Sequence, residues 1–216
     1  MALKDLQYTL LSDGPTDKAL MPILSWLLYQ RLPRCAVQHR WADLRPLPKP
    51  PKVLHEWIQT AIELYPCNLL FVHRDAEGES LLGSRSEVDD AVRQACGTGV
   101  IPPAIATVPV RMTETWLLFD AQAIRNAAGN PNGSIKLDLP RLTELESLPD
   151  PKSTLHNLIL KATELGTHRR ARFDVGTAIQ RIPEYIDDFS PLRGLPAFAA
   201  LETRIVDVIR EQRWCD

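Results

Sequence analysis

Short apolar runs alternate with amphipathic stretches in the N-terminal part of this chain. Four of the runs have the length and composition of buried strands and end at polar or turn-forming residues; they span residues 6–12, 35–41, 68–73 and 104–109. Between them, apolar residues recur at helical spacing over residues 17–32, 52–65 and 86–95. A further helix, capped by Thr113, is expected to hold Glu114 to Asp120. This alternation predicts a mostly parallel sheet of about four strands flanked by helices, in a Rossmann-like α/β fold.

The pattern changes after Gly129, where strand-like runs give way to helical periodicity. The helices expected there cover residues 153–165, 175–182 and 197–213. We therefore expect residues 1–128 to form an α/β domain and residues 129–216 to form a helical extension packed on it.

Composition narrows the choice of protein class. The 25 Lys and Arg residues against 27 Asp and Glu residues give a net charge of −2, which excludes a globally basic nucleic-acid coat but leaves room for a local basic groove. The start of the chain lacks the charged and apolar regions of a signal peptide, and no apolar run is long enough to cross a membrane. The four cysteines are too scattered for a disulfide scaffold or a zinc ribbon. We expect a cytoplasmic protein with reduced thiols and no membrane partner.

Acidic residues follow two of the predicted strands. Asp13 comes after the first strand, and Asp75 and Glu77 come after the third. Because parallel α/β sheets bind ligands at the carboxyl ends of their strands, these acids are expected to meet at one edge. Converging carboxylates repel one another unless a hard divalent cation such as Mg²⁺ lies between them. The alternative is that they are ordinary acidic loop residues.

A resemblance favours the metal site. The segments LLSDGPTDKAL, LLFVHRDAEG and VRMTETWLLFD are similar to the Toprim fold. They resemble more closely an uncharacterised bacterial Toprim-like family found among phage-defence genes. In that family the corresponding motifs are Glu-Gly-x-Thr-Glu, Asp-x-Asp and Glu-x-Trp-Leu-Leu-x-Asp. The resemblance continues over residues 150–152 and 195–198, so it covers most of the chain.

The resemblance implies a role for each matching residue. Asp13 takes the position of the general acid/base glutamate, and Asp75 and Glu77 take the metal-binding positions. Glu114 takes the position of the acid that precedes the tryptophan, here Trp116. Asp13 is one methylene shorter, and Glu77 one methylene longer, than the family residue. The implied catalytic set is therefore Asp13, Asp75, Glu77 and Glu114, with Mg²⁺ or Mn²⁺ held by the first three.

Two groups of basic residues are candidates for contact with nucleic-acid phosphates. The first lies between residues 31 and 52 and includes Arg40, Lys49 and Lys52. The second consists of His168, Arg169, Arg170 and Arg172. Trp41 and Trp57 lie near the basic residues of the first group and are candidates for base stacking. The alternative for both groups is a solvated protein surface.

Three functions remain open at this stage. The first is a metal-dependent Toprim-like nuclease, which the resemblance implies to be an effector of an anti-phage or toxin system working with an ATPase partner. The second is a weakened Toprim module that binds or regulates. The third is a phosphohydrolase acting on a small ester. P-loop, dinucleotide-binding, HExxH and G-x-S-x-G motifs are all absent from the sequence. The choice between DNA and RNA, and the presence of a homo-oligomer, stay open.

Overall fold

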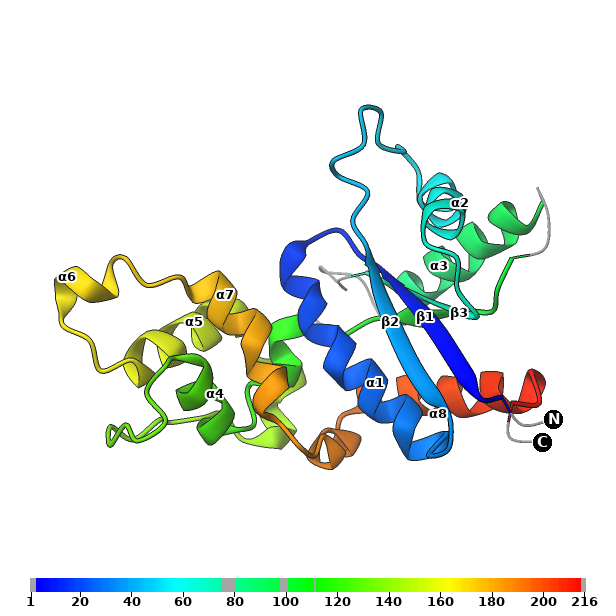
Figure 1. Ribbon diagram of the computed structural model, residues 1–216. Helices are drawn as coiled ribbons and strands as arrows, with labels where there is room; N and C mark the ends of the chain where they lie inside the picture. Colours follow the sequence, from blue (N-terminus) through cyan, green and yellow to red (C-terminus); the bar gives the residue numbers. More distant parts are fainter. Residues whose placement is uncertain (1–2, 75–80, 98–100, 111, 215–216) are drawn as a thin grey trace.

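The computed structural model of this chain describes residues 3–74, 81–97, 101–110 and 112–214 (Figure 1). Its centre is a four-stranded sheet in the order β2-β1-β3-β4, and every neighbouring pair is parallel. The strands are β1 (Asp5–Leu11), β2 (Ala36–Ala42), β3 (Leu69–His73) and β4 (Ala104–Thr107). The predicted α/β class and parallel four-stranded sheet are confirmed.

Helices and short 3-10 turns connect and follow the strands. The α-helices are α1 (Leu20–Arg31), α2 (Leu54–Leu64), α3 (Leu81–Cys96), α4 (Ala121–Ala127), α5 (Pro151–Ala162), α6 (Thr167–Arg170), α7 (Val175–Arg181) and α8 (Pro196–Glu211). The 3-10 turns are η1 (Pro15–Ala19), η2 (Thr113–Leu117), η3 (Leu142–Ser147), η4 (Ile182–Tyr185) and η5 (Ser190–Gly194).

Both faces of the sheet are covered, which explains why the central strand β3 is apolar up to its last residue, His73. In β1, Tyr8 and Leu10 belong to a core shared with α1 and α8, whereas Leu11 belongs to a second core shared with α2 and α3. In β3, Phe71 and Val72 divide between the two cores in the same way. Figure 1 shows α2 and α3 together on one side of the sheet and α1 on the other.

Among the helix boundaries that differ from the sequence prediction, two are those of the segments that hold Thr113 and Ser86. Residues 113–120 were expected to be one helix capped by Thr113, but the structure has the short turn η2 followed by α4. Asp120 explains the break, because its carboxylate accepts a hydrogen bond from the backbone N–H of Ala123 (2.8 Å) and so starts a new helix. The expected helix start at Ser86 is also wrong, since α3 already begins at Leu81.

The strand β4 forms one edge of the sheet and is only four residues long. Pro102 and Pro103 precede it and Pro109 follows it. The backbone carbonyl groups of Pro103 and Thr107 accept hydrogen bonds from N–H groups of β3 and of Arg74. Because backbone groups alternate in direction along a strand, the N–H and C=O groups of Ala104 and Ala106 point away from β3.

The C-terminal part of the chain packs against the sheet domain rather than standing apart. Helix α8 contacts β4 and α1, α7 contacts η1, and α5 contacts η2. The division into residues 1–128 and 129–216 stays a prediction. Within the described ranges, none of the helices has the length and apolar character needed to cross a bilayer.

A carboxylate joins α8 to two other elements. Glu202 on α8 is 8% exposed and accepts hydrogen bonds from Arg193 of η5 (2.8 and 2.9 Å) and from Arg31 of α1 (3.0 Å). The Arg193 hydrogen bond, helped by Arg31 and opposed by burial, lowers the pKa of Glu202. This cluster therefore ties the last helix to the first.

We expect Glu202→Gln to lower the free energy of unfolding by about 1–2 kcal/mol, because a charged acceptor of several hydrogen bonds is lost while the arginines stay partly hydrated. Urea denaturation measures this change. The matched control is Glu211→Gln, which removes an exposed ion pair with Arg204 and should change stability by less than about 0.5 kcal/mol. Equal effects of the two substitutions would contradict the interpretation.

The Glu202 carboxylate also makes the free energy of unfolding depend on pH. Because the folded pKa of Glu202 lies below its unfolded value, its contribution is complete above the unfolded pKa and disappears as the pH falls through the folded pKa. The stability gap between wild type and Glu202→Gln should therefore be largest near about pH 7 and shrink below about pH 4. Urea titrations of both proteins across this range measure the gap, and a constant gap would refute the assignment.

Candidate active site

The order of the strands creates a switch point between β1 and β3. After β1 the chain moves outward to β2, and it then returns past β1 to form β3 and β4. Parallel α/β sheets have a crevice where the chain direction reverses in this way, at the carboxyl ends of the two strands. Asp13 follows β1, His73 ends β3 and Arg74 follows it, so these residues flank the switch point.

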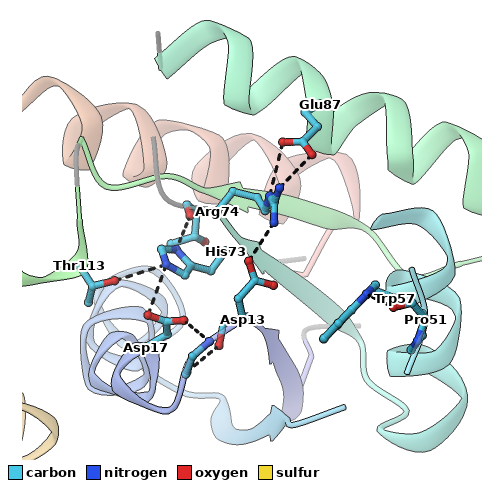
Figure 2. Close-up of polar contacts among 11 residues, drawn as sticks. Asp13, Asp17, Pro51, Trp57, His73, Arg74, Glu87 and Thr113 are labelled. Atoms are coloured by element: carbon cyan, nitrogen blue, oxygen red, sulfur yellow. Dashed lines mark hydrogen bonds and ion pairs between the residues drawn. The ribbon is translucent and has the colours of Figure 1, made fainter. Parts of the chain in front are cut away.

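Arg74 forms ion pairs with two carboxylates, one after β1 and one on α3, and so bridges the crevice (Figure 2). Its Nη1 donates to Asp13 Oδ2 (2.8 Å), and its Nη2 and Nε donate to the two Glu87 oxygens of α3 (3.1 and 3.4 Å). Partial burial alone would lower the pKa of Arg74, but the charges of Asp13 and Glu87 outweigh it and raise that pKa. Asp13, whose side chain is 65% exposed, is therefore an ion-paired residue open to solvent.

A buried polar chain lies directly beneath this ion pair. His73 Nδ1 lies 2.9 Å from the carbonyl oxygen of Thr107 in β4, and its Nε2 lies 3.5 Å from Asp17 Oδ1 and 3.4 Å from Thr113 Oγ1. His73 is 3% exposed and Asp17 is 7% exposed. His73 is therefore a buried histidine at the end of β3 with a backbone partner in β4.

Asp17 also fixes the turn that carries Asp13. Its Oδ2 accepts a hydrogen bond from the backbone N–H of Gly14 (2.9 Å). A Cβ atom on residue 14 would lie 3.3 Å from that same oxygen, which is a tight contact. Gly14 therefore allows the close approach, and Asp17 connects the turn after β1 to the end of β3.

A cavity of about 510 Å³ opens beside Asp13 between α2 and α3. Arg74 lines it from the sheet side, Glu87 from α3, and Trp57 from α2, with Lys52 just before that helix. His55 and Asp90 line it as well. The site thus contains cations, carboxylates, an imidazole and an indole ring on a cavity of the size that binds small molecules.

The described residues do not by themselves make a metal site. Within residues 3–74, 81–97, 101–110 and 112–214, no three His, Cys, Asp or Glu side chains gather as metal ligands. Asp13 has one oxygen in an ion pair with Arg74, and the predicted ligands Asp75 and Glu77 lie outside the described residues. Coordination of Mg²⁺ or Mn²⁺ by these acids stays a prediction.

The described residues of the third motif, VRMTETWLLFD, lie mostly in the hydrophobic core. Trp116 is fully buried and makes an edge contact with Phe198 of α8, with ring centroids 5.3 Å apart. Leu117 and Leu118 are also fully buried, and Glu114 is 5% exposed. Glu114 is not among the residues that line the cavity between α2 and α3. Its predicted catalytic role is untested.

The predicted basic contacts are spread over four places. Lys52 lines the cavity, whereas Arg40 is exposed on the edge strand β2 and Lys49 is exposed in the loop before α2. The second group lies on and just after α6, which projects from the helical part far from α2 and α3 (Figure 1). All of its members are exposed: His168, Arg169, Arg170 and Arg172.

Sequence reasoning missed Arg74 and Glu87 as partners of Asp13. The sequence did point to Arg74, because this residue directly follows the strand predicted over residues 68–73 and precedes the acidic residues Asp75 and Glu77. No pattern in the sequence pointed to Glu87, because only the packing of α3 against the sheet brings it within reach of the Arg74 guanidinium.

Comparison of the chain with protein-family models, with curated proteins and with solved structures finds no match. The arrangement of the site therefore has to be interpreted from its own geometry.

We expect Asp17→Ala to lower the free energy of unfolding by about 2 kcal/mol, because it removes a buried acceptor that serves both Gly14 N–H and His73. Thermal or urea denaturation measures the loss. The control is Asp187→Ala, at an exposed position, which should leave stability nearly unchanged. If both variants unfold alike, Asp17 does not support the turn.

Proposed function

We propose that this chain is a metal-dependent nuclease that hydrolyses phosphodiester bonds in nucleic acid at the crevice between β1 and β3. The observation that supports it best is that Asp13, Arg74 and Lys52 line one cavity at the switch point of a parallel sheet. Arg74 and Lys52 can hold a phosphodiester next to Asp13, which can accept a proton from an attacking water. The carboxylates of Glu87 and Asp90 line the same cavity.

In this proposal Arg74 binds the phosphate. Its guanidinium has a planar set of donors that suits phosphate oxygens, and Glu87 holds it in position from α3. Once a phosphate takes the donor now used by Asp13, that carboxylate is released. Asp13 can then orient water or accept its proton, since its side chain is exposed to the crevice.

The metal in this proposal rests on the motif resemblance, with Asp13, Asp75 and Glu77 as the ligands of Mg²⁺ or Mn²⁺. Such an ion would neutralise phosphate charge. The same resemblance supports a cytoplasmic effector of an anti-phage or toxin system. In that setting the resemblance implies control by a separate ATPase partner, an arrangement compatible with a chain that has no P-loop motif of its own.

A second candidate is a binding or regulatory subunit without nuclease activity. The Asp13–Arg74 ion pair favours it, because an acid neutralised by an arginine is a poorer cation ligand. The two functions share the cavity and differ in whether a bond is broken.

Incubation of the purified full chain with labelled DNA and RNA, in single-stranded and duplex form, tests the proposal. We expect cleavage with Mg²⁺ or Mn²⁺ and none with EDTA. Asp13→Asn should lower the cleavage rate by about 100-fold or more with little change in stability, because the side chain is exposed. Asp187→Asn, at an exposed position of the helical part, is the control and should cleave like wild type.

The outcomes separate the two candidates. Loss of cleavage in Asp13→Asn with wild-type stability supports the nuclease. Nucleic-acid binding with no cleavage under any of these conditions supports the binding subunit. Full activity of Asp13→Asn would overturn the role given to this residue.

A further inference from the structure

We infer that the cavity between α2 and α3 binds one unpaired nucleotide, with its base stacked on Trp57 and its phosphate at Arg74 and Lys52, so that the chain prefers single-stranded nucleic acid. This inference rests on the proposed function for the presence of nucleic acid at the crevice, and it adds the form of the substrate.

The first argument is the rigidity of Trp57. Its indole N–H donates to the carbonyl oxygen of Pro51 (2.8 Å), and Pro50 and Pro51 stiffen the segment that carries this acceptor. Figure 2 shows the ring on the α2 side of the crevice, with Asp13 and Arg74 at the strand ends. A ring held in one orientation loses little conformational freedom when a base stacks on it.

The second argument is that other tryptophans are already engaged. Trp41 has Lys18 over its ring (4.1 Å) and Arg45 nearby (5.2 Å), Trp26 has Arg193 (5.1 Å), and Trp116 is fully buried. Trp57 is half-buried and lines the cavity. Trp57 packs against the second core on one side, and of the five tryptophans it is the one that lines the cavity, so it is the one placed to receive a ligand ring there.

The third argument is the position of the cations. Arg74 lines the cavity from the strand ends, and Lys52 lines it from the segment just before α2, five residues before Trp57. Lys52 is exposed, so its ammonium group can follow a phosphate. The cavity of about 510 Å³ lies within the range of small-ligand sites, which suits one nucleotide better than a duplex.

The fourth argument is chemical. Stacking on an aromatic side chain needs an exposed face of the base, which a base pair inside a duplex does not offer. Stacking also tolerates every base, so the inference includes no sequence preference. Single-stranded DNA and single-stranded RNA share this chemistry, and both are used as probes.

The test is fluorescence anisotropy of short labelled single strands and of the matching duplexes, with the full chain in EDTA so that no cleavage occurs. Trp57→Phe keeps a flat ring and should bind single strands within about three-fold of wild type. Trp57→Leu keeps apolar bulk for packing on α2 and should bind single strands about ten-fold more weakly. Trp57→Leu should bind duplexes as wild type does.

Trp26→Phe is the matched control and should leave single-strand binding unchanged, since Trp26 lies on α1, packs against Phe189 and is not among the cavity-lining residues. Lys52→Gln should weaken single-strand and duplex binding together and reduce the dependence on salt. Thermal denaturation of every variant identifies a folding defect.

Equal single-strand binding by Trp57→Leu and wild type would overturn the inference. So would an equal loss of duplex binding, because that would mean the ring only shapes the cavity. The inference and the proposed nuclease fail separately. Cleavage with no effect of Trp57→Leu rejects the stacking site alone, and a stacking effect without cleavage rejects the nuclease alone.

Discussion

The contact between Asp17 and His73 is the constraint on which the candidate site depends. Each residue is buried, and each has a second partner in the backbone, Gly14 for Asp17 and Thr107 for His73. Together they join the turn after β1 to the ends of β3 and β4. A buried polar pair of this kind is stable only when its hydrogen bonds are satisfied, so it favours one geometry of the crevice. The buried pair thereby also positions the exposed Asp13–Arg74 ion pair, because Asp13 lies in the turn that Asp17 holds and Arg74 directly follows His73.

Much of the fold could be predicted from the sequence because it depends on local patterns. The run over residues 68–73 is apolar on both sides, as a central strand of a covered sheet must be, and it became β3. The helix boundaries were harder, because they depend on single side-chain contacts. Asp120 ends one segment and starts another through one hydrogen bond, and no periodicity in the sequence shows it.

The candidate site could be predicted only in part. Its location followed from the parallel topology, and Asp13 does lie at the expected edge. Its electrostatics did not follow, because Arg74 and Glu87 reach Asp13 through tertiary packing. The motif around Trp116 shows the opposite problem. Its resemblance to a family suggested chemistry, yet the tryptophan and the leucines after it fill the core.

The short strand β4 has a consequence for how this protein meets other molecules. Only Ala104 and Ala106 offer outward backbone groups along that strand, and prolines stand on either side of it. A foreign strand that tried to extend the sheet there would gain few ladder hydrogen bonds and would soon meet residues that have no N–H to give. This border of the molecule therefore resists edge-to-edge aggregation, and of the two sheet edges the longer strand β2 is the one that a foreign strand could extend.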